Sequence, residues 1–141
     1  MYRIKIFSIS KTKESWLQEA LEEYEKRLKP IMPIEWILAK NNEQLKLLLE
    51  KESHFIALTL SAKEPTSEQF AKDLYFWLEH FGSRLTFLIG GAEGIPQDIL
   101  EKAFSTLSLS KLTFTHQMAR LLLVEQIYRA TEIHKKSGYH K

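Results

Sequence analysis

Two short, uninterrupted apolar runs constrain the fold more than any other feature of this chain. They lie at Phe55–Leu60 and Leu85–Ile89, and runs of this length are typical of strands buried on both faces of a parallel sheet. Amphipathic patterns flank them, most clearly at Glu14–Leu28, where apolar residues recur near helical spacing. Strands that alternate with helices predict an α/β fold with three layers, in which helices cover both faces of a mostly parallel sheet.

The remaining elements follow from local signals. Thr66 and Gln69 have the spacing of a capping box, which predicts a helix that ends near Phe81. Pro96 suits the first turn of another helix. We expect further strands at Tyr2–Ile9, Ile34–Leu38 and Thr106–Leu109, and further helices from Asn41 or Asn42 to Lys51 and over Thr115–Lys135.

Composition narrows the possible classes of protein. A chain of 141 residues favours a single domain over 1–141. The absence of cysteine excludes disulfides and suits a cytoplasmic protein. No apolar run approaches the roughly 18 residues of a membrane span, and the five histidines lack the spacing of a metal site, so we expect neither a membrane segment nor a metal.

Positive charge gathers at the end of the sequence. Residues 111–141 hold six Lys or Arg and two Glu, whereas the preceding 110 residues hold 14 basic and 16 acidic side chains. This asymmetry indicates either a surface that faces an anion or an ordinary solvated helix end.

Ligands of open parallel sheets bind at the carboxyl ends of the strands. Three such ends attract attention: Leu58–Ser61, Ile89–Gly94 and Leu109–Lys111. The glycine motif Gly90–Gly94 is neither a Walker loop nor a dinucleotide fingerprint, so it is either a ligand loop or a tight turn. The polar stretch after the last strand ends at a helix cap, Thr113 or Thr115.

The final helix carries charge inside an apolar stretch. Arg120 lies within it, and Glu125 and Arg129 have the i, i+4 spacing of a helical ion pair. A helix that is apolar on all sides needs cover on all sides, from a second subunit or from its own chain. His116, in the first turn, should be neutral there, and it could act as a base or simply cap or pack.

Several segments together resemble one family over the whole length. They are Phe87–Ile95, Leu107–His116, Arg120–Ala130 and the terminal pair Tyr139-His140. The chain resembles the RlmH family, bacterial SPOUT-class methyltransferases that modify N3 of a pseudouridine in 23S ribosomal RNA. The family usually has proline where Ala92, Thr115 and Gly138 stand.

The resemblance implies a three-layer α/β/α SPOUT fold with a C-terminal trefoil knot, in a homodimer with the final helix at its interface. It implies that S-adenosylmethionine is the cofactor and that the substrate is 23S rRNA in the ribosome. Carried over by position, Arg129, Tyr139 and His140 are the active-site residues, and the terminal pair reaches the partner's pocket. The cofactor-binding residues are Leu58, Gly91, Ser110, Lys111, Leu112, Thr113, Phe114 and Thr115.

Two other functions stay open at this stage. One is a ribosome- or RNA-binding factor without catalysis. The other is a SPOUT methyltransferase that acts on tRNA.

Overall fold

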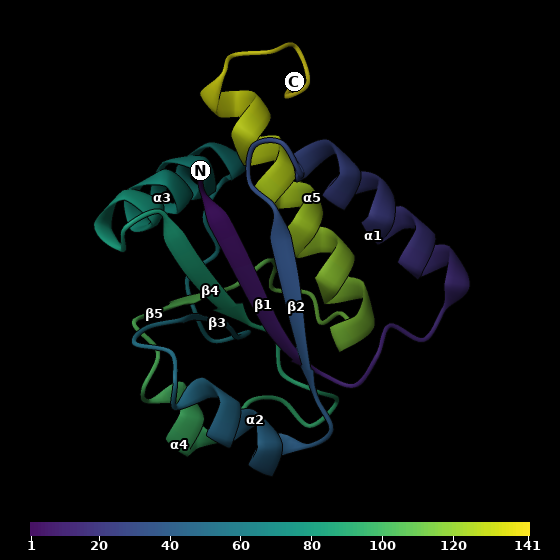
Figure 1. The fold of residues 1–141 in the computed structure, drawn as a ribbon, viewed down its shortest axis with the longest axis vertical. Coiled ribbons are helices and arrows are strands. Elements are labelled where there is room, and N and C mark those ends of the chain that lie inside the picture. Colours follow the sequence, from purple (N-terminus) through teal and green to yellow (C-terminus); the bar gives the residue numbers. More distant parts are fainter.

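A computed structural model describes residues Met1–Lys141 as one five-stranded sheet with five helices (Figure 1). The sheet order is β2-β1-β4-β3-β5, and all neighbouring strands are parallel. The strands are β1 (Arg3–Ile9), β2 (Ile34–Ala39), β3 (Ile56–Leu58), β4 (Arg84–Leu88) and β5 (Ser105–Leu107). The predicted parallel sheet is therefore confirmed.

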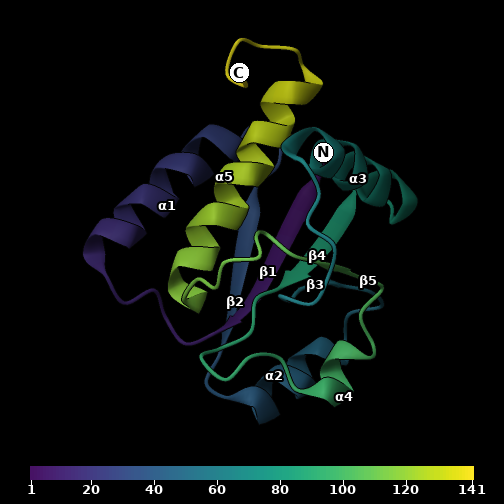
Figure 2. The same ribbon diagram turned by 180° about the vertical axis from the view of Figure 1, so that it is seen from behind.

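Helices cover the sheet on both faces. The helices α1 (Ser15–Leu28), α3 (Ser67–His80) and α5 (His116–His134) pack on one face, and α2 (Asn42–Leu49) and the short α4 (Gln97–Leu100) on the other (Figures 1 and 2). Alternation along β1 divides the core, because Ile4 and Ile6 join the larger apolar cluster and Phe7 the smaller one. The three-layer arrangement is confirmed.

Local capping signals set most helix starts. Asn41, Thr66 and Thr115 cap α2, α3 and α5, each accepting a hydrogen bond from the backbone N–H three residues later. Thr115 is thus the cap, rather than Thr113. The capping box is only half formed, since the side chain of Gln69 donates to Asp73 instead of returning to Thr66.

Some predicted boundaries were wrong by one or two residues. The buried run Phe55–Leu60 forms only the three-residue strand β3, because regular pairing ends after Leu58 and Leu60 already belongs to a turn. The last strand starts at Ser105 and ends at Leu107. Pro96 stands just before α4 as its cap, with ψ 144°, rather than inside its first turn.

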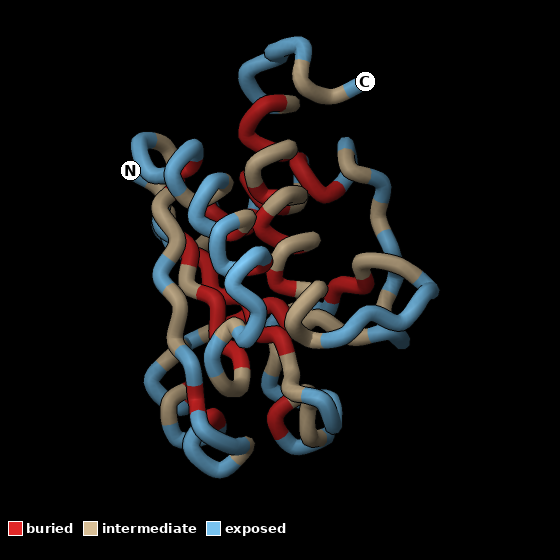
Figure 3. Tube along the Cα trace, turned by 90° about the vertical axis from the view of Figure 1, so that its right-hand side faces the viewer, coloured by how far each residue is buried: buried red, intermediate tan, exposed pale blue.

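The final helix is covered largely by its own chain. Leu123, Val124 and Ile127 of α5 are fully buried, and the helix lies between α1 and α3 (Figure 1). The tube in Figure 3 shows buried and half-buried residues alternating along the helix that leads to the C-terminus. Leu121 and Leu122 remain half-buried. Cover from a second subunit stays a prediction, as does the trefoil knot. None of the helices combines the length and the apolar character needed to cross a membrane.

Candidate active site

The carboxyl ends of β3, β4 and β5 meet at one cavity. Its volume is about 980 Å³. Its wall includes Leu58–Leu60 from the end of β3, Ile89–Ala92 from the end of β4 and Leu107–Ser110 from the end of β5. These are the three strand ends that the sequence singled out, and parallel strands bring them to one edge of the sheet.

The glycine motif after β4 is both a tight turn and part of the cavity wall. The N–H of Gly94 donates to the carbonyl of Gly91 at 3.0 Å, and Gly94 has a φ of 81°. A Cβ on Gly90 would lie 2.9 Å from the carbonyl carbon of Gly94, so the turn admits no side chain there. The tight turn is therefore confirmed, and the ligand loop stays a prediction.

The loop after β5 folds on its own polar groups. The hydroxyl of Ser108 donates to the carbonyl of Ser110 at 2.9 Å, and the N–H of Leu112 donates to the hydroxyl of Ser110 at 3.0 Å. This loop, with the turns at Leu58 and Gly91, carries the predicted cofactor residues. All of them line the cavity except Lys111, whose ammonium lies 3.8 Å from the Glu64 carboxylate instead.

The segment between β1 and α1 supplies a fourth wall that the sequence did not indicate. Lys13, Glu14 and Trp16 line the cavity. The N–H of Lys13 donates to the side chain of Gln117 at 3.1 Å, and the Gln117 amide donates back to the carbonyl of Lys11 at 3.1 Å. The start of α5 and this segment are therefore joined at the cavity.

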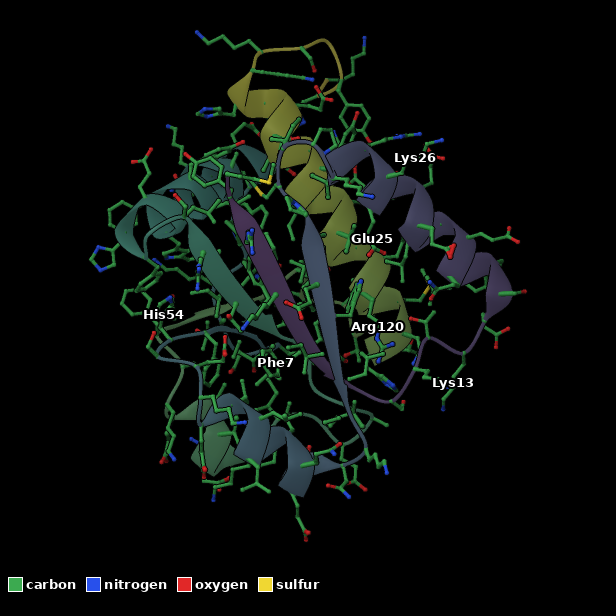
Figure 4. All side chains as sticks on the ribbon, viewed as in Figure 1. Phe7, Lys13, Glu25, Lys26, His54 and Arg120 are labelled. Carbon is green, nitrogen blue, oxygen red and sulfur yellow. The ribbon has the colours of Figure 1, made fainter.

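Arg120 holds the same segment in place by hydrogen bonds. Its side chain is fully buried and donates to the carbonyls of Ile9 and Ser10, both at 2.7 Å, and to the hydroxyls of Ser8 and Thr12 (Figure 4). Ser10 has a φ of 59°, a strained conformation that these contacts hold in place. Burial lowers the pKa of Arg120 from its usual range, but no carboxylate pairs with it. Arg120 is thus a structural residue.

His116 lines the cavity at the first turn of α5. Burial lowers the pKa of this imidazole, and the nearby charges of Arg120 and Lys13 lower it further. The prediction of a neutral histidine agrees with this direction. The dominant cause is burial, however, rather than the positive end of the helix.

A second cluster forms where the C-terminal tail folds back on α5. Arg129 and Glu125 form the predicted ion pair, with Nη2 3.1 Å from Oε2. The hydroxyl of Tyr139 donates to the same Glu125 oxygen at 2.8 Å, and the Arg129 guanidinium lies 4.9 Å from the centre of the Tyr139 ring. His140 lies 3.0 Å from Arg129 and 3.1 Å from Glu68 of α3. We call these five residues the tail cluster.

The contacts of the tail cluster also shift the pKa values of two of its members. Burial and the hydrogen bond to Glu125 raise the pKa of Tyr139 well above its usual range. The Glu125 carboxylate raises the pKa of Arg129. Tyr139 and Arg129 are therefore a neutral phenol and a cation at physiological pH.

The cavity and the tail cluster lie at different heights along α5. His116 lines the cavity at the start of the helix, and Arg129 follows 13 residues later, about 20 Å along the axis. Figure 1 shows the tail at the far end of α5 from the first turn of that helix. Within this chain, the three predicted catalytic residues thus stand together but apart from the cavity.

Comparison with known proteins decides the family. The family model described as "Predicted SPOUT methyltransferase" matches residues 2–140. The ribosomal RNA large subunit methyltransferase H of Protochlamydia amoebophila is 50% identical over 141 residues, which cover the whole of both chains. The chain belongs to the SPOUT methyltransferases.

Other SPOUT relatives agree. The ribosomal RNA large subunit methyltransferase H of Syntrophomonas wolfei is 37% identical, with 99% of each chain covered. Among solved structures, TrmJ from Z. mobilis ZM4 superposes with a TM-score of 0.54 at 10% identity, over 92% of this chain and 69% of that one. The structural match supports the SPOUT fold, and the sequence matches place the chain in the family of ribosomal RNA large subunit methyltransferase H.

Two residues of this SPOUT site were not predicted from the sequence. Glu68 lies in the first turn of α3, and nothing in its local pattern marks a partner for His140, 72 positions later. Trp16 stands on the exposed start of α1, 55% accessible, and looks like an ordinary amphipathic residue until the fold brings it to the cavity mouth. Both are products of tertiary packing.

Proposed function

We propose that this chain is an S-adenosylmethionine-dependent methyltransferase that methylates N3 of a pseudouridine in large-subunit (23S) ribosomal RNA. The observation that carries the proposal is the cavity where the ends of β3, β4 and β5 meet, in a chain that is 50% identical to a ribosomal RNA large subunit methyltransferase over its whole length. S-adenosylmethionine supplies an activated methyl group on a sulfonium.

The lining of the cavity suits such a donor. Apolar side chains such as Leu58 and Leu107 can take an adenine ring, and the turns at Gly91 and Ser110–Thr115 offer backbone polar groups close to it. The donor has no phosphates, so the glycine turn needs no phosphate cradle, in agreement with its departure from the Walker and dinucleotide patterns. We assign donor binding to Leu58, Gly91 and Ser110–Thr115, with Lys111 at the rim of the loop.

The sulfonium of the donor is already a good leaving group. The side chains of the protein therefore mainly have to accept the N3 proton and to stabilise the resulting anion. As the bond between N3 and the methyl carbon forms, the bond from that carbon to sulfur breaks, and the N3 proton must leave. We assign proton acceptance to His140. Arg129 stabilises the negative charge that develops on the imide, and Tyr139 holds the guanidinium in place.

A homodimer would bring these groups to the donor. Within one subunit, Arg129 lies about 20 Å along α5 from His116. Four exposed apolar side chains surround the mouth of the cavity: Trp16, Leu60, Leu112 and Phe114. Exposed apolar patches of this kind indicate a surface that a partner covers. We propose that the partner subunit covers this mouth and brings its own Arg129, Tyr139 and His140 to the base.

The proposed substrate is 23S rRNA within the assembled ribosome, in the cytoplasm. The chain has a net charge of only +2, which would give weak attraction to free RNA. An assembled ribosome would offer a surface of fixed shape, which the protein could recognise in addition to the charge of the RNA. The two alternatives to this function are a SPOUT methyltransferase that acts on tRNA and a ribosome- or RNA-binding factor without catalysis.

Three measurements test the proposal together. Calorimetric titration with S-adenosylmethionine should give saturable binding, with one site per subunit. Mass spectrometry of RNA treated with the protein should find one methylated pseudouridine in 23S rRNA and none in tRNA. Arg129→Ala should keep donor binding and lose methylation by about 100-fold or more, since it removes an electrostatic stabiliser. No heat of donor binding would favour the binding factor, and a methylated tRNA would favour the tRNA enzyme.

A further inference from the structure

The amino-terminal half of the sheet is bare on one face. In Figure 1, α2 and α4 lie below the carboxyl-terminal halves of the strands, and no helix crosses the upper parts of β1, β2 and β4. Phe7, near the lower end of β1, is buried under α2 (Figure 4). Two and four residues before it, alternation places Lys5 and Arg3 on the same face.

A cavity of about 750 Å³ occupies this bare face. Strands β1, β2 and β4 form its floor, and the segment Lys51–His54 between α2 and β3 forms one wall. The ring of His54 stacks on Phe81, with 3.4 Å between the ring centres, and this pair closes the side. Its size is within the range of small-ligand sites. We call it the amino-end cavity.

The charges in the amino-end cavity are unbalanced. Four basic side chains line it (Arg3, Lys5, Lys51 and Arg84), against two acidic ones (Glu35 and Glu52). Glu52 is already engaged, since it pairs with Lys5 at 3.4 Å and accepts the hydroxyl of Thr86 at 2.9 Å. Arg3, Lys51 and Arg84 have no ion pair.

Arg3 and Arg84 are also direct neighbours. They face each other in register on the adjacent strands β1 and β4. Like charges directly opposite each other in a sheet are destabilising, and both side chains are exposed rather than used in the core. An arrangement that costs stability and serves no packing role is typical of a site for an anion, because two guanidinium groups can clamp phosphate oxygens.

We propose that the amino-end cavity binds phosphodiester groups of the ribosomal RNA, at a second contact remote from the methylated base. This inference rests on the proposed function for the identity of the RNA. Arg3 and Ile9 stand at opposite ends of β1, about 20 Å apart. Ile9 packs against Gly91 at the donor cavity. The two contacts would therefore hold RNA at opposite ends of the sheet, and the second would add affinity without touching the reaction.

The test uses the full-length protein with Arg3→Gln and Arg84→Gln combined. Binding to a 23S rRNA transcript and to large ribosomal subunits is measured by filter binding between 50 and 200 mM salt. The matched control removes two exposed lysines that lie outside the cavity, Lys72→Gln and Lys102→Gln. A third variant, Arg3→Lys with Arg84→Lys, keeps both charges.

We expect the glutamine pair to weaken affinity for both RNA targets by on the order of tenfold or more at low salt. The slope of log affinity against log salt should fall by about 1.4, or roughly 0.7 for each lost phosphate contact to single-stranded RNA. KM for subunits should rise while kcat and donor affinity stay as in the wild type, and the melting temperature should not fall. The lysine pair should keep most of the salt slope.

Equal affinity and equal salt slope in the glutamine pair and the control would overturn the proposal. So would a loss of binding to subunits with unchanged binding to the transcript, because the face would then take a ribosomal protein. Failure of the proposed function looks different: donor binding or methylation would be absent in the wild type itself.

Discussion

Nη1 of Arg129 lies 3.0 Å from Nδ1 of His140. A guanidinium has only donors, so Nδ1 must be the acceptor in this pair, and the ring proton of the neutral imidazole must be on Nε2. Nε2 lies 3.1 Å from the Glu68 carboxylate, which can accept that proton. The contacts therefore select one tautomer, in which the lone pair of Nδ1 accepts from Arg129, so this contact must open before Nδ1 can take the N3 proton.

Glu68→Gln tests this orientation. The amide oxygen can still accept from Nε2, but it cannot stabilise a protonated imidazole by charge. Glu68 is 61% exposed, and exposed pairs of this kind contribute only about 0.2–1 kcal/mol, so kcat should fall by no more than about fivefold. His140→Ala, in contrast, should lower kcat by about 100-fold or more if His140 is the base. Single-turnover methylation of large subunits measures both effects, and equal rates in wild type and His140→Ala would remove His140 from the mechanism.

Glu125→Gln should loosen the tail cluster. The carboxylate accepts from Arg129 and from Tyr139, and both ion-pair side chains are less than a third exposed. We expect a loss of about 1–2 kcal/mol in the free energy of unfolding, measured by urea denaturation, since hydrogen bonds to a charged group are lost. Unchanged stability together with an unchanged methylation rate would mean that Glu125 does not position Arg129.

The same cluster predicts how stability depends on high pH. Burial, and then Glu125, raise the pKa of Tyr139 in the folded state, whereas the unfolded chain ionises near pH 10. The folded state therefore holds the proton longer, so the contribution of Tyr139 is present below about pH 10 and is lost as pH rises above it. In Glu125→Gln the pKa of Tyr139 should fall but stay raised, because burial is the larger cause. Ultraviolet titration of tyrosinate, with Tyr139→Phe as the reference, measures the shift.

Arg120→Met removes the buried charge but keeps most of the apolar volume. The carbonyls of Ile9 and Ser10 lose their partner, and Ser10 loses the contacts that hold its φ of 59°. We expect a loss of about 2–4 kcal/mol in the free energy of unfolding. Donor affinity should fall as well, because Lys13 and Glu14 continue this segment into the cavity wall. Arg129→Met, on the same helix but half-buried, is the control, and it should keep donor affinity.

The sequence predicts those parts of this fold that local patterns encode. The apolar runs at 55–60 and 85–89 indicate buried strands, and the rule for parallel sheets then brings Leu58, Gly91 and Ser110 to one edge, where the cavity lies. The pair Glu125–Arg129 is a short-range feature that spacing alone identified, whereas spacing left the cap of the final helix open between Thr113 and Thr115.

Contacts between distant segments were not predictable in the same way. The partners of Arg120 are carbonyls and hydroxyls some 108 to 112 positions earlier in the chain, and every sequence offers such acceptors. Arg3 and Arg84 become neighbours only through the pairing of β1 with β4. Strand order and register, which no local pattern encodes, determine both arrangements.

Mixing two inactive variants tests the central claim most directly, namely that the donor cavity of one subunit works with the tail cluster of the other. Gly91→Val would distort the cavity wall, because an added Cβ would lie only 3.2 Å from the side chain of Ile9, and Arg129→Ala would remove the proposed anion stabiliser. Each homodimer should be folded and inactive, with donor binding lost only in Gly91→Val. After subunit exchange, a heterodimer would pair one intact cavity with one intact tail from the partner. The account predicts that methylation of large subunits returns in the mixture, and a mixture as inactive as its two parents would contradict it.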